Sequence, residues 1–228
     1  MSEEISCMDL FRCRNTILEL LEYRGFINNK IDFFMTYDYF TEIYKIWLEN
    51  ESILDIYINN HVNKCYVHFR RTKMVFPKKE NKNQKKGTIH FYKMAIKLDK
   101  YDTLVFVLTN KDIIINKINI YETSYPLIQF FEWTHLLFNV TNHNMVPNHR
   151  ILSIKEKENI LSKYQMKTVS KLPKISKNDP VAKFIGMRIG DVCEITRSSK
   201  VKGGTKRNPK WIDAGKNLYY RTAVQLFE

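Results

Sequence analysis

Acidic residues beside predicted strands are the first candidates for chemistry in this chain. Metal-dependent cleavage of a phosphodiester needs clustered carboxylates that hold a cation near a water molecule, usually an Asp on one strand and a Glu-x-Lys on the next. Asp55 lies in a predicted strand, but the following strand, CYVHF at residues 65–69, contains no acid. Asp102 begins another strand and is followed by the uncharged LVFVLT, while Glu156 and Glu158 belong to a predicted solvated helix. A nuclease therefore stays an alternative without a complete metal site.

Histidines are the other candidate bases and metal ligands. His143 and His149 flank Pro147 with no third ligand nearby and no adjacent Ser or Cys. We expect them to make structural hydrogen bonds, with an interface contact as the alternative. His61 and His68 are expected in a strand pair and its loop, without a function. The sequence thus predicts no catalytic residue, no metal and no cofactor.

Charge is the clearest bulk property of the 228 residues. The formal net charge is +13, from 37 Lys and Arg against 24 Asp and Glu. A surface this basic attracts polyanions, of which nucleic acid is the usual one, although a ribosome-like or acidic protein partner fits the same charge. A hydrophobic fraction of 44% is ordinary for a folded protein with a sizeable core. The chain is rich in Ile, Lys and Asn, which is typical of an AT-rich genome.

Cysteine usage and hydropathy bear on the compartment. Cys7, Cys13, Cys65 and Cys193 form no C-x-x-C pair and have no His at zinc-like spacing, which indicates reduced thiols in a cytosolic or nuclear protein. The N-terminal MSEEISCMDL is acidic and lacks a secretory apolar segment. No apolar run approaches ~18 residues, so we expect no membrane partner.

Helical and strand patterns alternate in the first half of the chain. Residues 10–24 are predicted to form an amphipathic helix that ends at Gly25, and a second helix begins after the N-cap Thr36. The apolar face of the first helix comprises Leu10, Cys13, Ile17, Leu20 and Leu21. The arginines expected to face elsewhere are Arg12, Arg14 and Arg24.

Short β-branched runs separate these helices from later ones. The predicted strands are 53–58, 65–69, 74–76 and 104–108, the predicted helices are 88–100 and 111–121, and a lysine-rich loop covers 78–87. The unbroken apolar run at 104–108 is typical of a strand covered on both faces. This alternation predicts an α/β layered fold for the first half.

The pattern changes near residues 141–146, where we place a domain boundary. Residues 153–164 are predicted to form a helix with a capping box of Ser153 and Glu156. Beyond it, Asp179 precedes Pro180 as an N-cap and first helical residue, and Gly186 ends that short helix. Gly190 is expected at positive φ before a strand at 192–197. A compact helix-turn-strand unit of this kind favours a docking surface over an active site.

These same residues resemble a known family. LPKI and DPVAKFIGMRIGDVCEITRSS within residues 172–199, preceded by NVTNHNMVPNHRILS at 139–153 and followed by YYR at 219–221, resemble the fifth common subunit of the eukaryotic nuclear RNA polymerases, whose archaeal counterpart is the H-type subunit of RNA polymerase. The first half resembles the family more loosely, at RCRNTILELLEYRGF (12–26), MVFP (74–77) and GTIHFYK (87–93).

The resemblance implies a non-catalytic subunit of a multisubunit DNA-directed RNA polymerase. Its fold class would be α/β (α+β), with a nuclease-like α/β jaw domain at residues 1–142 and a small mixed α+β assembly domain at 143–228. The assembly domain would dock on the largest subunit beside small subunits, and the jaw would lie near downstream duplex DNA. The alternatives are a free-standing basic DNA-binding protein and a nuclease-like enzyme.

The resemblance and the charge pattern select two sets of candidate residues. The expected partner-binding residues are Pro147, His149, Leu172, Pro173, Asp179, Pro180, Arg188, Arg197, Tyr220 and Arg221. The expected DNA-proximal residues, which would contact phosphates weakly and without reading sequence, are Arg12, Arg24, Lys78, Lys79, Lys82, Lys85 and Lys86.

The chain departs from the family pattern at two places. Residues 201–217 form a basic insertion between two family strands, either a solvated hairpin extension or an added contact to nucleic acid or a subunit through Trp211. LTNKD at 108–112 replaces a family loop.

The jaw makes the chain eukaryote-like, and its divergence suggests a large DNA virus. We therefore expect a nuclear location, or a virion or cytoplasmic viral factory if the chain is virus-encoded.

Overall fold

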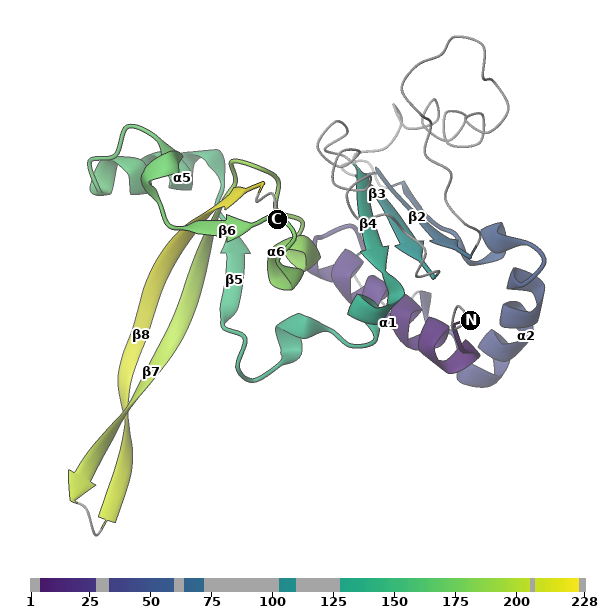
Figure 1. Cartoon of the computed structure of the whole chain (residues 1–228), viewed down its shortest axis with the longest axis horizontal. Coiled ribbons are helices and arrows are strands. Elements are labelled where there is room, and N and C mark those ends of the chain that lie inside the picture. The colour runs from purple at the N-terminus through teal and green to yellow at the C-terminus, as the bar shows by residue number, and fades with distance from the viewer. Residues whose placement is uncertain are drawn as a thin grey trace. The chain divides into compact units, whose positions relative to one another are not determined.

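The computed structural model describes residues 5–27, 33–59, 64–71, 103–109, 128–205 and 208–225, with the side chains of 198–214 outside that description. The chain divides into two compact units, Met1–Phe138 and Asn139–Glu228 (Figure 1). Helices and mixed sheets occur in both, which confirms the expected α+β fold class. The jaw and assembly roles expected for residues 1–142 and 143–228 stay predictions.

Helix α1 (Cys7–Tyr23) forms where the amphipathic pattern predicts it. Ser6 caps it by accepting a hydrogen bond from the backbone of Asp9, and Gly25 follows its end at φ +73°. The expectation that Arg14 faces away from the core is wrong, because Arg14 is 3% exposed and donates from Nη1 to the carbonyl of Phe33 at 2.9 Å. Arg14 follows Leu10 by four residues, so the two share a helix face, and that face is wider than the apolar pattern indicates.

Helix α2 (Tyr37–Trp47) begins after the predicted N-cap Thr36, whose hydroxyl accepts from Tyr39 N. Trp47 is fully buried, and its indole N–H donates to the carbonyl of Phe69 at 3.1 Å. The strand expected at 53–58 is shorter, because Glu51–Leu54 form the 3₁₀ helix η2. The Asn50 side chain caps that turn by accepting from Ser52 N, a local hydrogen bond that competes with strand formation.

The first unit contains a four-stranded sheet in the order β1-β2-β3-β4. Its strands are β1 (Ile56–Asn59), β2 (Lys64–Arg70), β3 (Thr103–Leu108) and β4 (Ile128–Glu132), followed by the 3₁₀ helix η3 (Trp133–Leu136). β1 pairs antiparallel with β2, whereas β2, β3 and β4 are parallel. Every residue of β3 is buried, which confirms a strand covered on both faces. The elements expected at 74–76, 88–100 and 111–121, and the loop at 78–87, lie outside the described residues.

The second unit contains the sheet β5-β7-β8-β6 and two short helices. Its elements are η4 (Val140–Asn142), β5 (Asn148–Ile151), α5 (Ile154–Lys163), η5 (Val169–Lys171), β6 (Lys174–Ser176), α6 (Pro180–Ile185), β7 (Val192–Thr205) and β8 (Asn208–Val224). A small core forms around Leu152, Leu172 and Val192, against which Ile160 and Tyr220 pack. The capping box of Ser153 and Glu156 is present with both of its hydrogen bonds, as predicted.

Within the described residues, no helix combines the length and the apolar character needed to cross a membrane.

Gly190 offers a test of the backbone geometry of the second unit. Its φ is +89°, and an added Cβ would meet no atom within 4 Å, so an alanine there reports backbone strain alone. We expect Gly190→Ala to lower the free energy of unfolding by about 1 kcal/mol, measured by urea denaturation. Gly190→Asn is the matched control and should lose less, because Asn tolerates the left-handed region. Equal losses in both variants would contradict the strain argument.

Candidate functional site

The helix-turn-strand unit predicted from the sequence is present in the second unit. Asp179 caps α6, its Oδ1 accepting from Val181 N at 2.9 Å and from Ala182 N at 3.1 Å. Pro180 occupies the first turn, and Gly186 ends the helix at φ +84°. Since α6 has only six residues, these caps supply much of the local reason why it forms.

Backbone hydrogen bonds connect this unit to the end of β8. Gly190 N donates to the carbonyl of Ala223 at 3.0 Å, and Ala223 N donates to the carbonyl of Asp191 at 2.9 Å. On the other side, Thr222 N donates to the carbonyl of Pro173 at 2.9 Å, and β6 pairs in parallel with β8. The segment before β6 and the turn after α6 are therefore held by the same end of β8.

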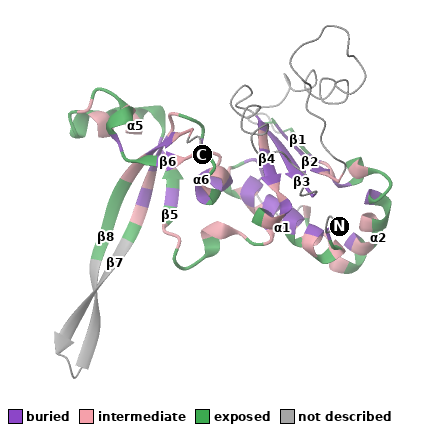
Figure 2. Ribbon diagram, in the orientation of Figure 1, coloured by how far each residue is buried: buried purple, intermediate pink, exposed green. Residues whose placement is uncertain are grey.

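The two sides of α6 differ in burial (Figure 2). Val181, Ala182, Phe184 and Ile185 are buried and connect the helix to its unit. Four of the exposed residues of this region are Pro173, Pro180, Arg188 and Ile189, which we call the α6 surface. Ile189 is 52% exposed and was missed by sequence reasoning, although an apolar residue between Arg188 and Gly190 in a turn is a usable signal.

The predicted partner-binding residues differ in exposure. Pro173, Pro180, Arg188 and Arg197 are exposed; Pro147, Asp179, Tyr220 and Arg221 are half-buried; His149 and Leu172 are buried. The buried pair can act only by shaping the unit, because its side chains present little surface.

His143 and His149, which flank Pro147, make the structural hydrogen bonds expected of them. His149 Nδ1 lies 2.7 Å from the carbonyl of Pro147, and His143 Nδ1 accepts from Met145 N at 3.2 Å. Each bond spans two residues, so the two rings stabilise the local chain path that leads into β5.

A second exposed group lies where β7 and β8 leave the sheet. The Arg197 guanidinium lies 5.2 Å from the centre of the Tyr219 ring, a cation–π contact. Tyr219 and its neighbour Leu218 are about half exposed, at 48% and 51%. Sequence reasoning selected Arg197 but missed Tyr219 and Leu218. The alternation of side chains along a strand does not reveal which face of the strand another helix or strand covers.

A charged network on the same sheet orients Tyr220. The Arg150 guanidinium donates to Glu156 at 2.7 Å and to Glu194 at 3.1 Å, and the Tyr220 hydroxyl donates to Glu194 at 3.2 Å. The pKa of the Glu156 carboxyl is lowered to about 2. The hydrogen bond from the backbone N–H of Ser153 is the largest cause, and the hydrogen bond from Arg150 is the next largest. The network thus connects β5, α5, β7 and β8 through charge-assisted hydrogen bonds.

The DNA-proximal candidates are only partly described. Arg12 lies on α1 with 57% of its side chain exposed and 3.6 Å from Asp9, and Arg24 is the C-cap of the same helix. The remaining candidates, Lys78, Lys79, Lys82, Lys85 and Lys86, lie outside the described residues.

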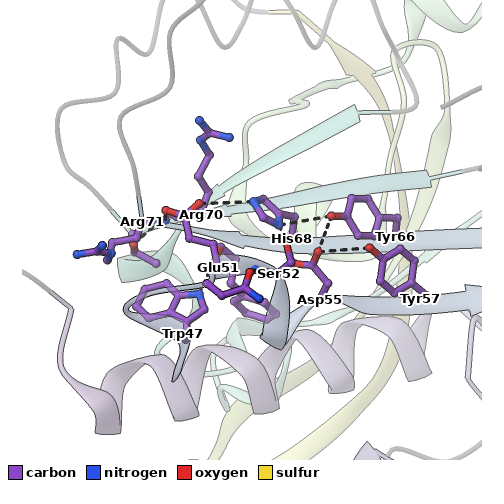
Figure 3. A network of polar contacts seen from close by, with 12 residues as sticks. Trp47, Glu51, Ser52, Asp55, Tyr57, Tyr66, His68, Arg70 and Arg71 are labelled. Atoms are coloured by element: carbon purple, nitrogen blue, oxygen red, sulfur yellow. Dashed lines mark hydrogen bonds and ion pairs between the residues drawn. The ribbon is translucent and has the colours of Figure 1, made fainter. Parts of the chain in front are cut away.

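Asp55, the acid singled out as a possible metal ligand, lies in a polar network on the first unit (Figure 3). It directly precedes β1 rather than lying within a strand. His68 Nδ1 is 2.7 Å from Asp55 Oδ1, the Tyr66 hydroxyl donates to Oδ2 at 2.7 Å, and Tyr57 donates to the same oxygen at 3.4 Å. The Asp55 side chain is 1% exposed, so both oxygens are occupied by protein groups and connect η2 to the β1–β2 hairpin.

Burial and this carboxylate together raise the pKa of the Tyr66 hydroxyl, which keeps it a neutral donor. Glu51 approaches the other ring nitrogen of His68 at 3.8 Å. In the part of the chain that the structure describes, no three His, Cys, Asp or Glu side chains are grouped as a metal site. Asp102 lies outside that part.

The four cysteines are free thiols, as predicted, and three of them are buried. Burial raises the pKa of the Cys13 thiol and of the Cys65 thiol to about 12. These two sulfurs are therefore protonated at neutral pH, which makes them poor nucleophiles.

Comparison with known proteins identifies relatives that match part of this chain. The model of the family "RNA polymerase Rpb5, C-terminal domain" matches residues 138–206. The DNA-directed RNA polymerase subunit Rpo5 of Thermococcus kodakarensis is 41% identical over 88 residues, which cover 39% of this chain and 92% of that protein.

Eukaryotic relatives match over a smaller share of their length. The subunit rpabc1 of DNA-directed RNA polymerases I, II, and III of Dictyostelium discoideum is 44% identical over 82 residues, 36% of this chain and 41% of that protein. The corresponding subunit RPABC1 of Caenorhabditis elegans is 40% identical over 79 residues, 35% of this chain and 36% of that protein. The matches thus span less than half the length of these relatives.

Removing the Asp55 carboxylate should destabilise the first unit. Asp55→Ala leaves the Tyr66 hydroxyl and His68 without their acceptor in a buried site, and we expect a loss of about 3 kcal/mol in the free energy of unfolding, measured by urea denaturation. Tyr57→Phe is the matched control, because Tyr57 is 61% exposed and its bond to Asp55 is long, at 3.4 Å. The control should stay within about 0.5 kcal/mol of the unsubstituted protein. Similar losses in both variants would argue against the network.

The Glu156 network predicts a specific acid dependence. Because the folded-state pKa of Glu156 lies near 2, below its ordinary value of 4.5, its contribution to stability is complete above about pH 4.5. It is lost as the pH falls from that value towards 2. A carbon-detected NMR titration of the full chain should place the midpoint of Glu156 near 2, and Arg150→Met should raise it only in part, because the Ser153 N–H remains. A midpoint at the ordinary value would overturn the assignment.

Proposed function

Because the chain belongs to the Rpb5 family of DNA-directed RNA polymerase subunits, we propose that it acts as a non-catalytic subunit of a multisubunit RNA polymerase. The family membership confirms the resemblance noted in the sequence. In this proposal residues 143–228 dock on the largest subunit beside small subunits, and residues 1–142 form a jaw near downstream duplex DNA.

The α6 surface is the observation that carries the docking proposal. Its residues belong to a segment whose path is fixed by the Asp179 cap, two left-handed glycines and the hydrogen bonds to Ala223. A surface that is ordered before binding loses little conformational entropy when it docks. It also combines proline and isoleucine with Arg188, and Arg is enriched at protein interfaces. These properties support a preformed contact to a protein partner.

The jaw proposal rests on charge and on the predicted lysine-rich loop. Arg12 and Arg24 belong to α1, and the five lysines between residues 78 and 86 lie in the expected loop. Basic side chains that contact phosphates without reading bases would allow DNA to slide past the subunit.

A non-catalytic role agrees with the state of the candidate chemical groups. Both oxygens of Asp55 accept hydrogen bonds from protein groups, and burial raises the pKa of the Cys13 and Cys65 thiols to about 12, which disfavours their reactive thiolate form. The compartment follows that of the polymerase, so a nuclear location, or a virion or viral factory for a virus-encoded chain, stays a prediction.

Charge reversal on the α6 surface tests the proposal. We expect Arg188→Glu in the tagged full chain to reduce the amount of largest polymerase subunit that co-purifies by at least about tenfold, because truncating or reversing a central interface Arg typically costs about 2 kcal/mol or more. Quantitative mass spectrometry of the purified complexes gives the ratio.

Lys167→Glu is the matched control, since Lys167 is an exposed cation between α5 and η5 in the same unit. It should leave the ratio unchanged. An equal loss in both variants would remove the α6 surface from the docking proposal, and a wild-type chain that brings down no polymerase subunits would refute the function itself.

A further inference from the structure

Helix α2 of the first unit carries two apolar stripes. Phe40, Tyr44 and Trp47 form the inner stripe, in which the residues are spaced by four and then three positions. Phe40 and Trp47 are fully buried, and the Tyr44 hydroxyl donates to the carbonyl of Ile5 at 2.9 Å. The inner stripe therefore connects α2 to the rest of its unit.

A second stripe of Tyr39, Ile43 and Ile46 has the same spacing and begins one position earlier in the chain. Because an α-helix has 3.6 residues per turn, a shift of one position rotates a stripe by about 100° around the helix. Tyr39 is 56% exposed, Ile46 is 48% exposed and Ile43 is half-buried. Figure 2 shows that buried and exposed residues alternate along α2. We call Tyr39, Ile43 and Ile46 the outer α2 stripe.

The spacing of the outer α2 stripe indicates what kind of element can cover it. A surface helix ordinarily presents polar residues on the side that does not face the core. Apolar residues at i, i+4 and i+7 instead form the seam along which two amphipathic helices pack. The stripe covers only about two helical turns, so we expect a weak or transient contact rather than a permanent one.

The charges beside the outer α2 stripe select the partner further. Residues 37–49 contain three acids, Asp38, Glu42 and Glu49, and one base, Lys45, and all four side chains are exposed. Lys45 Nζ lies 2.8 Å from Glu42 Oε1, so this base is paired with an acid of its own helix. The surface beside the stripe is therefore acidic, although the chain as a whole carries a net charge of +13.

An acidic surface disfavours several other occupants. Its carboxylates would repel nucleic acid and anionic membranes. A second copy of this chain, packed through the same stripe, would bring two sets of acids together, and like charges placed opposite each other weaken association. Basic side chains on both sides of an apolar seam would instead meet the acids, as charged residues do at the e and g positions of paired helices.

We propose that the outer α2 stripe docks a basic amphipathic helix of another protein. Tyr39, Ile43 and Ile46 supply the apolar contact, and the neighbouring acids pair with Lys or Arg side chains of that helix. The inference does not rest on the proposed function, because it involves neither the α6 surface nor DNA. The purified full chain is sufficient to test it.

Two synthetic amphipathic peptides of about three heptads serve as probes. Both have Leu at the a and d positions, and one has Lys at e and g where the other has Glu. Fluorescence anisotropy of the labelled peptide gives its affinity for the full chain. We expect the Lys peptide to bind at least about tenfold more tightly than the Glu peptide. The net charge of the chain would by itself give the opposite order, so this comparison isolates the local acidic surface.

Ile46→Ser tests the stripe itself. It removes an exposed apolar side chain from the middle of the proposed contact, so we expect the affinity for the Lys peptide to fall about tenfold. Ile154→Ser is the matched control, because it makes the same substitution at a residue of α5 that is 77% exposed. The control should stay within about twofold of the unsubstituted chain. Far-UV circular dichroism verifies that both variants keep the fold.

Hydrogen-exchange mass spectrometry of the unsubstituted chain locates the contact without any substitution. Binding of the Lys peptide should slow amide exchange in Tyr37–Trp47, because a docked helix opens less often, and should leave Ile154–Lys163 unchanged.

Several results would overturn the proposal. These are no binding of the Lys peptide, equal or tighter binding of the Glu peptide, equal losses in the Ile46 and Ile154 variants, and slowed exchange only outside α2. Light scattering of the chain without peptide is measured in parallel. A dimer that Ile46→Ser abolishes would assign the stripe to a second copy of the chain and would also contradict a basic partner.

Discussion

Backbone pairing at the end of β8 is the interaction on which the second unit depends most. Ala223 is 1% exposed, accepts from Gly190 and donates to Asp191, and its neighbour Thr222 donates to Pro173. Buried backbone groups that lose such partners carry a large desolvation cost. The chain before β6 and the turn after α6 are thus placed by the last residues of β8, a strand that also pairs antiparallel with β7. The α6 surface and the pairing of β7 with β8 consequently depend on the same strand end.

Polar groups in both units are arranged to stabilise elements rather than to react. On one sheet Arg150 connects Glu156 and Glu194, and on the other Asp55 accepts from Tyr66 and lies beside His68. A buried carboxylate with both oxygens occupied has little capacity left for a cation or a water molecule. This agrees with the non-catalytic role proposed above.

The sequence predicted features that depend on near neighbours and missed those that depend on distant ones. The Ser153 capping box and the Asp179 cap involve residues two or three positions apart, so the local pattern was sufficient. The burial of Arg14 and the exposure of Tyr219 depend on which elements cover a helix or a strand, and periodicity does not contain that information. The local cap pattern predicted the α6 unit, whereas the family motifs that selected the partner-binding candidates could not separate exposed Pro173 from buried Leu172.

The β7–β8 hairpin contains a bulge at Gly215, where Ser198 pairs with Lys216 and the next pair is Lys200 with Asp213, and this bulge has an evolutionary consequence. Because it absorbs the change in register between the base of the hairpin and its tip, residues can be gained or lost beyond it without displacing the strands that hold α6. Gains in matched pairs would preserve the alternation of side chains on each face. Lineages of this family could therefore lengthen, shorten or recompose the tip under selection while leaving the ancestral fold of the subunit intact.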